Sequence, residues 1–187
     1  PLEEAAWLDG RVYVAAHNDG IAVFDVLDDR LVAVPAAEVP GNLSRLSRVG
    51  DGLAVGTPSG TLTLLGPDLQ QRGSLELGAP ILAIEEVGPG RAVVALGSAG
   101  LALIDVDPLA VRARMDTHGA AVRLAALPED RVLVANWHDV RLYRLADDGF
   151  ELIAVDGLFQ AEERPRILAV AGRDDVVVAG EWKNLHT

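Results

Sequence analysis

Hydrophobic residues alternate with small or polar residues along most of the chain, in short runs separated by glycine, proline, aspartate and asparagine. A period of two places every second side chain on the same face of a β-strand. The residues between the runs are those that turns favour, because several of them tolerate a positive φ. The pattern predicts an all-β protein built from short strands and tight hairpins.

One apolar run recurs five times, at steps of 41, 39, 40 and 44 residues. Its copies are residues 11–15, 52–56, 91–95, 131–135 and 175–179. Each of the first four is followed by a polar turn and a second alternating run, which together indicate a hairpin. A third apolar run precedes the hairpin and a fourth follows it, so each repeat predicts four consecutive strands, A to D.

Four strands in a repeat of about 40 residues are typical of one blade of a β-propeller. Two β-sandwiches would not require a constant period, and a leucine-rich repeat would need a period of about 20–29 residues. The sequence therefore predicts one all-β propeller domain over residues 1–187, with four four-stranded blades and the first half of a fifth. The predicted blades cover residues 3–34, 43–77, 81–115, 122–155 and 166–187.

One segment fits the repeat less well. Residues 110–127 are rich in alanine, arginine and leucine, which favour a helix. Because tertiary context overrides intrinsic propensity, the position of this segment in the repeat outweighs its composition. We predict strand D, a loop over residues 116–119, and then strand A of the next blade.

Counting strands predicts an open arc. Residues 3–8 supply strand A of the first blade, and the sequence ends at Thr187 within strand C of the fifth. Neither end has a spare strand to complete the other. We expect a fragment of a propeller of six to eight blades, or a partner that completes it; a four-bladed ring with a loose tail is the alternative. An open blade edge would favour self-association.

The hairpins resemble those of the LVIVD-repeat propellers of bacteria and archaea, which are related to YVTN and WD-type propellers. The resemblance rests on residues 12–15 followed by 20–26, and on residues 100–108, which are similar to the family pattern G-L-x-V-x-D-V-x-x-P. Two repeats depart from it, at Gly66-Pro67 and at Arg144-Leu145. The resemblance implies an exported or cell-surface protein, with cytoplasmic location as the alternative, and it implies no particular activity.

Charge and composition narrow the possible partners. Acidic residues outnumber basic ones 28 to 16, giving a net charge of −12, which repels nucleic acid and anionic lipid. No apolar run is long enough to predict a membrane span. The absence of cysteine excludes disulfides, thiolate nucleophiles and iron–sulfur clusters within these residues. We expect no cofactor.

Few residues suggest chemistry. His17 and His138 occupy equivalent turns, but they belong to the first and fourth blades, so a shared metal site is not favoured. Paired carboxylates fall in turns, where they hydrogen-bond locally, and no catalytic motif is present. The sequence therefore predicts no catalytic residue and no metal ligand.

Three arginines stand at similar positions in their strand A: Arg45, Arg123 and Arg166. Strand A lines the axis of a propeller, so these guanidinium groups could form a basic patch that binds a carboxylate or phosphate. The alternative is a structural role, in which each pairs with a loop aspartate or a neighbouring carbonyl. The residue pattern favours the structural role.

A second candidate surface lies at the turns between strands B and C. Trp137 and His138 occupy this turn in the fourth blade, and Trp182 occupies it in the fifth. Aromatic residues are enriched at binding hot spots, although each indole could instead cover its own blade. Together with the long connection over residues 156–166, these turns form the preferred binding region.

The predicted function is a non-catalytic binding scaffold that engages a protein, a glycan or a small anionic molecule at its loop face. One alternative is the propeller portion of a larger enzyme whose catalytic residues lie on other blades or another domain. A purely architectural repeat is the third possibility.

Overall fold

The structure is a computed structural model that describes residues 4–16, 18–36, 39, 41–156, 167–173, 176–181 and 185–186. Within this part of the chain all regular structure is β-strand. The strands are β1 (Glu4–Leu8), β2 (Arg11–Ala15), β3 (Ile21–Leu27), β4 (Arg30–Val34), β5 (Arg45–Val49), β6 (Gly52–Gly56), β7 (Thr61–Leu65), β8 (Gln71–Glu76), β9 (Ala83–Glu86), β10 (Arg91–Ala95), β11 (Leu101–Val106), β12 (Leu109–Met115), β13 (Ala121–Leu127), β14 (Arg131–Asn136), β15 (Val140–Ala146), β16 (Gly149–Asp156), β17 (Ile167–Arg173), β18 (Val176–Glu181) and β19 (Leu185–His186).

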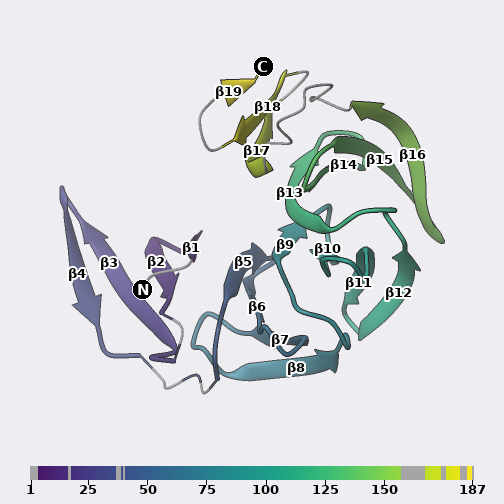
Figure 1. Cartoon of the computed structure of the whole chain (residues 1–187). Helices are drawn as coiled ribbons and strands as arrows, with labels where there is room; N and C mark the ends of the chain where they lie inside the picture. The colour runs from purple at the N-terminus through teal and green to yellow at the C-terminus, as the bar shows by residue number, and fades with distance from the viewer. Residues whose placement is uncertain are drawn as a thin grey trace.

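The first sixteen strands form four antiparallel sheets of four strands each, which we call sheets 1 to 4 in chain order. In every sheet the strands pair in the order of the sequence, as a series of hairpins. Strands β17 to β19 form a further, three-stranded sheet. Figure 1 shows the sheets following one another in chain order, each beginning with its inner strand. The predicted all-β architecture of four-stranded sheets is confirmed.

The alanine-rich segment is extended, as its place in the repeat predicts. Strands β12 and β13 cover most of residues 110–127, with a loop between them. Adjacent residues of β13 are buried on opposite sides: Leu124 packs toward sheet 3, whereas Ala125 packs away from it, near Val170. Only a strand sends neighbouring side chains to opposite faces, so burial on both sides overrides the helical propensity.

The sheets stack face against face and share a core at each junction. On β10, Ala92 and Val94 pack against sheet 2, whereas Val93 and Ala95 pack against sheet 4. All four side chains are at most 3% exposed. Strands covered on both faces need apolar residues at every position, which explains the continuous apolar runs in the sequence.

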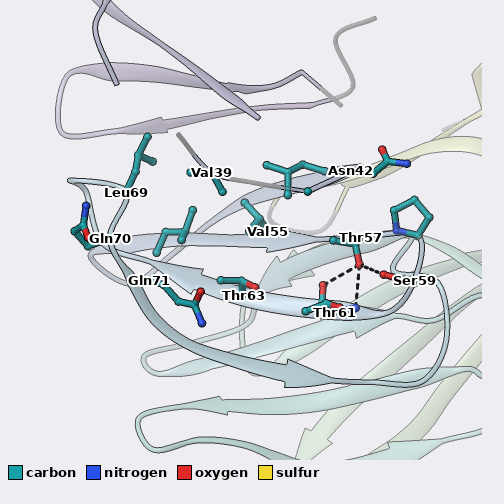
Figure 2. Close-up of a pocket in the computed structure, with 14 residues that line it drawn as sticks. Val39, Asn42, Val55, Thr57, Ser59, Thr61, Thr63, Leu69, Gln70 and Gln71 are labelled. Atoms are coloured by element: carbon teal, nitrogen blue, oxygen red, sulfur yellow. Dashed lines mark hydrogen bonds between the residues drawn. The ribbon is translucent and has the colours of Figure 1, made fainter. Parts of the chain in front are cut away.

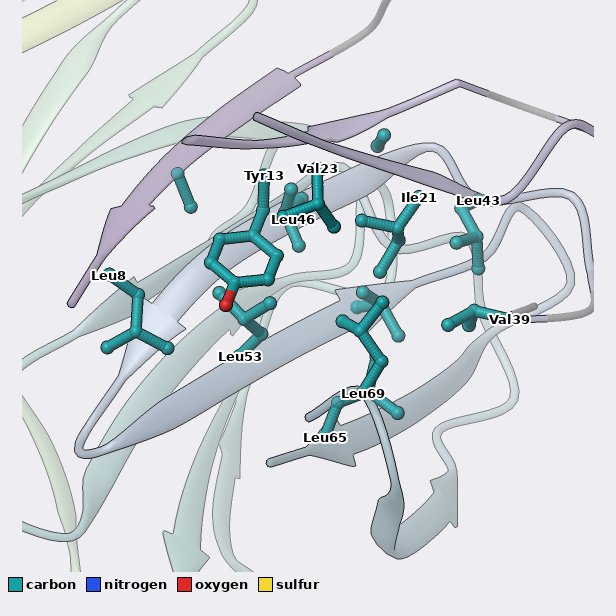
Figure 3. Close-up of a cluster of buried hydrophobic side chains, with 13 residues drawn as sticks. Leu8, Tyr13, Ile21, Val23, Val39, Leu43, Leu46, Leu53, Leu65 and Leu69 are labelled. Atoms are coloured by element: carbon teal, nitrogen blue, oxygen red, sulfur yellow. The ribbon is translucent and has the colours of Figure 1, made fainter. Parts of the chain in front are cut away.

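The core between sheets 1 and 2 contains a buried tyrosine (Figure 3). The Tyr13 side chain is 1% exposed, and its hydroxyl donates a hydrogen bond of 3.0 Å to the Pro67 carbonyl oxygen in sheet 2. The hydroxyl therefore keeps a partner inside an apolar cluster and links the two sheets.

Among the described residues, no helix is present that could cross a lipid bilayer.

Candidate functional site

Consecutive strands are antiparallel, so the turn between the second and third strand of each sheet (B–C) lies at the same end of the stack as the connection from its fourth strand to the next sheet (D–A). We call this end the rim. In sheet 4 the rim turn is closed by Asn136, whose backbone N–H donates to the Asp139 carbonyl oxygen at 2.9 Å. Its side-chain Nδ2 donates to Asp139 Oδ1 at 2.6 Å. The sequence analysis did not single out Asn136, although it directly follows the recurring apolar run.

Asp139 is held by an arginine on the next strand. Arg141 donates from Nε to Oδ1 at 2.9 Å and from Nη2 to Oδ2 at 3.0 Å, a bidentate arrangement. Burial by itself would raise the pKa of Asp139, but the hydrogen bonds from Arg141 and Asn136 outweigh it and lower that pKa. The carboxylate is therefore ionised at neutral pH and serves to fix the turn.

The two predicted binding residues of this turn differ in exposure. Trp137 is half-buried and His138 is exposed. Beneath them, Asn136 is 2% exposed, and its Oδ1 atom has no hydrogen-bond partner among the described residues. Trp182 and His17 lie outside the described residues, so the predicted side-by-side tryptophans stay a prediction.

Two of the three predicted arginines are described, Arg45 on β5 and Arg123 on β13, and both strands are the inner strands of their sheets. Arg45 is half-buried and donates from Nε to the Leu82 carbonyl oxygen and from Nη1 to that of Ser44. Leu82 immediately precedes β9, so Arg45 joins sheet 2 to sheet 3. Arg123, also half-buried, donates from Nη1 to the Val122 carbonyl oxygen at 2.7 Å. Arg166 lies outside the described residues. The carbonyl contacts of Arg45 are of the kind that the structural alternative describes, and the role of the three arginines stays a prediction.

Glutamates on the inner strands perform a similar joining role that the sequence analysis missed. Glu4 on β1 accepts a hydrogen bond of 2.8 Å from the Leu46 N–H on β5. Glu86 on β9 accepts one of 2.9 Å from the Gly50 N–H. An inner strand is a sheet edge, and its outward N–H groups need acceptors. The sequence signal that could have identified these glutamates is a carboxylate within an otherwise apolar predicted strand.

Glu85, on β9, makes a third contact of this kind. Its Oε1 accepts a long hydrogen bond of 3.4 Å from the Ala126 N–H in sheet 4. Burial raises the pKa of Glu85 above its ordinary value, and the nearby carboxylates of Glu4 and Glu86 raise it further. One weak hydrogen bond does not offset the cost of burying the charge.

We expect Glu85→Gln to raise the melting temperature by a few degrees at pH 7, because the amide keeps an acceptor for Ala126 and removes the buried charge. A carboxyl whose folded-state pKa is raised destabilises the fold above that pKa, and the penalty vanishes as the pH falls toward the unfolded value of about 4.3. Thermal melts at pH 7 and pH 4.5 should therefore show a gain that disappears in acid. Glu86→Gln is the matched control, because it removes one negative charge at the neighbouring residue. An equal, pH-independent rise in melting temperature in both variants would contradict this account.

A groove of about 750 Å³ runs along the side of sheet 2 that faces sheet 1 (Figure 2). We call it the sheet 2 groove. In Figure 1 the outer strands β3 and β4 diverge from β7 and β8, whereas the outer strands of the later sheets lie closer together. The groove is lined by Val39, Gly41, Asn42, Leu43, Val55, Thr57, Pro58, Ser59, Thr61, Thr63, Leu65, Leu69, Gln70 and Gln71.

Hydrogen bonds among hydroxyl groups order the rim end of this groove. Thr57 Oγ1 lies 2.8 Å from Ser59 Oγ and accepts a 3.0 Å hydrogen bond from the Thr61 N–H. Figure 2 shows these contacts at the turn between β6 and β7. The local network fixes the turn, so the groove wall is preformed at this end.

The repeats differ in sequence at the wall of the groove. Thr63 pairs with Val55 in sheet 2, and Ala102 pairs with Val94 in sheet 3, so the two residues are equivalent. Ala102 is fully buried against sheet 2, whereas Thr63 is half-buried and faces the groove. The Thr63 hydroxyl lies 3.3 Å from Ser74 Oγ on β8, so this wall of the groove carries a hydrogen-bonded pair of hydroxyl groups where the next junction has an alanine.

No three potential metal ligands come together in the part of the chain that the structure describes. Two of the carboxylates near the rim and the inner strands are instead engaged elsewhere, Asp139 with Arg141 and Glu4 with the Leu46 N–H. Their contacts fit roles in joining turns and sheets.

No family model and no curated protein matches the chain. Solved structures do resemble it. One chain in a crystal structure of the mitotic checkpoint complex is 11% identical with a TM-score of 0.79, over 96% of this chain and 58% of that one. The fold is β-propeller-like.

The computationally designed Ika8 protein shows the same likeness, with 12% identity and a TM-score of 0.75, over 96% of this chain and 55% of that one. The chain thus spans just over half the length of both solved structures. At such low identity the likeness concerns the fold alone.

Proposed function

We propose that the chain is a non-catalytic scaffold for protein–protein interaction. The observation that carries this proposal is an uncovered apolar face on sheet 1. Trp7 pairs with Val12, and Val12 pairs with Phe24, so these three side chains share one face of the sheet. The opposite face, which includes Ala6 and Leu8, packs against sheet 2.

The equivalent face is covered in each of the next three sheets. Val12 corresponds to Leu53, Ala92 and Val132, which are at most 3% exposed and pack against the preceding sheet. On sheet 1, by contrast, Trp7 is 54% exposed and Val26 is 37% exposed. Exposed apolar patches of this kind mark protein interaction sites.

The equivalent faces of the other repeats indicate which kind of partner could cover this face. Each equivalent face receives the sheet of another blade, so we propose that sheet 1 also receives a blade-like sheet, either from a propeller of six to eight blades or from a second copy of the chain. In the first case the described sheets and the fifth blade form part of a larger ring. Sedimentation of the wild-type chain beside a Trp7→Glu variant tests this face.

The rim provides the second part of the proposal. We propose that Trp137, His138 and Trp182, with the connection over residues 156–166, contact a partner, and that Arg45, Arg123 and Arg166 mainly join blades. The LVIVD-type resemblance further suggests a bacterial protein that works at the cell surface or outside the cell.

We expect a Trp137→Ala, Trp182→Ala double variant to weaken partner binding at least tenfold while its far-UV circular dichroism stays unchanged, because aromatic side chains dominate binding hot spots. Surface plasmon resonance measures the change in affinity. The ligand is a peptide that is selected from a phage-displayed library for binding to the wild-type protein. Leu152→Ala, on an exposed residue of β16, is the matched control. Loss of the β spectrum in the double variant would instead show that the indoles are packing residues.

A further inference from the structure

We propose that the sheet 2 groove binds an extended, uncharged peptide segment of a partner protein. This inference rests on the proposed function as an interaction scaffold and names a site and a ligand class for it. The groove is separate from the rim turn of sheet 4 and from the uncovered face of sheet 1. Its volume of about 750 Å³ is within the range of ligand-binding pockets.

The described residues that line the groove include no ionisable side chain. This is unusual for a chain with 44 charged residues, the sum of 28 acidic and 16 basic, and a net charge of −12. A charged ligand group would lose hydration on entering and gain no opposite charge from the lining. The lining therefore favours a ligand segment without charge, and it disfavours the anionic small molecule considered in the sequence analysis.

The polar groups of the groove match those of a peptide backbone. Hydroxyl and carboxamide groups both donate and accept hydrogen bonds, and a peptide unit presents one donor and one acceptor. Gln70 and Gln71 are exposed at the groove edge, and their side-chain amides make no hydrogen bond to another described residue. These amides are free to pair with the N–H and C=O groups of a bound segment (Figure 2).

The apolar part of the lining suits alternate side chains of an extended segment. Val55, Leu65 and Leu69 are at most 6% exposed and form an apolar surface beside the hydroxyl groups. Strand β7, from Thr61 to Leu65, runs along the groove for roughly 13 Å at about 3.3 Å per residue. A segment of four or five residues would cover this length, with every second side chain directed inward.

An oligosaccharide is the competing ligand, because it is also neutral and rich in hydrogen-bonding groups. The described residues of the groove lining include no aromatic side chain on which a sugar ring could stack. Small apolar side chains of a peptide would instead contact the leucines and valines. The lining therefore favours a peptide.

The test is selection of random twelve-residue peptides displayed on phage against the wild-type chain, followed by titration of the enriched peptides. We expect peptides with an uncharged core of four or five residues, whose affinity falls at least tenfold in Thr63→Arg and in the Gln70→Ala, Gln71→Ala double variant. The Gln70→Ala, Gln71→Ala variant changes only exposed residues, so it should keep the fold even if Thr63→Arg does not. Leu152→Arg, remote from the groove on β16, is the matched control and should bind as the wild type does.

The other possible results separate failure of the groove proposal, failure of the scaffold proposal and a wrong ligand class. If every enriched peptide binds Thr63→Arg normally, and affinity is lost only in the Trp137→Ala, Trp182→Ala variant, the groove proposal is overturned and the rim is supported. No enrichment at all would overturn the groove proposal and weaken the scaffold. Neutral oligosaccharides that bind the wild type and not Thr63→Arg, with no peptide enriched, would overturn the peptide assignment.

Discussion

Leu103→Ala should lower the stability of the chain by about 2–5 kcal/mol, the range for removing a large aliphatic side chain from a core. Leu103 on β11 is fully buried in the core shared by sheets 3 and 4. Its loss leaves a cavity that touches both sheets, so the junction between them is weakened as well as the strand itself. For a domain of this size, the melting temperature should fall by about 4–20 °C.

The matched control for this prediction is Leu152→Ala. Leu152 on β16 is 49% exposed, and truncation of such a residue changes stability by about 0.5 kcal/mol or less. Thermal denaturation followed by far-UV circular dichroism measures both variants under the same conditions. Equal, small shifts would contradict the assignment of Leu103 to an inter-sheet core.

The strands could be predicted from the sequence because their signal is local. The recurring apolar run, the glycine-containing turns and the alternation after each turn all lie within one repeat. Residues 110–127 show the limit of this approach, because their composition favours a helix and only the period assigns them to strands. Burial of Leu124 and Ala125 on opposite faces supplies the physical reason.

The candidate sites were less predictable because they depend on how neighbouring sheets meet. Nothing within one repeat shows that β3 and β4 diverge from sheet 2, so the sheet 2 groove was not foreseen. Comparison between repeats does show a threonine at Thr63 where sheet 3 has Ala102, but this difference alone does not specify a groove, since sheet 4 has Arg141 at the same position. Glu85 was also missed, because its burial and its contact with Ala126 of sheet 4 depend on how the sheets meet, and Glu4, whose charge also raises its pKa, lies in another repeat.

The arginines illustrate an inference that remained open at the level of sequence. A guanidinium on an inner strand can bind an anion or a carbonyl, and sequence spacing does not distinguish the two. The contact of Arg45 with Leu82 crosses from one sheet to the next. It depends on the approach of two inner strands, which the sequence of a single repeat does not specify.

Trp7→Glu should abolish self-association of the chain. In the wild type, the uncovered face of sheet 1 exposes Trp7 beside Val12 and Phe24, in the position where sheets 2 to 4 each receive another sheet. Burying that face against a second copy is favourable by roughly 25 cal/mol per Å² of apolar surface. A carboxylate on this face would be desolvated without a partner, so the contact should be lost. Since Trp7 is 54% exposed, the variant should fold normally.

Sedimentation velocity over a range of protein concentrations tests the scaffold proposal most directly, with Leu152→Glu as a control for adding one charge at an exposed apolar residue. We expect the wild type and Leu152→Glu to form dimers or larger species as concentration rises, and Trp7→Glu to stay monomeric with an unchanged melting temperature. A wild type that remains monomeric at every concentration, and sediments identically to Trp7→Glu, would contradict the claim that this face binds a second copy of the chain.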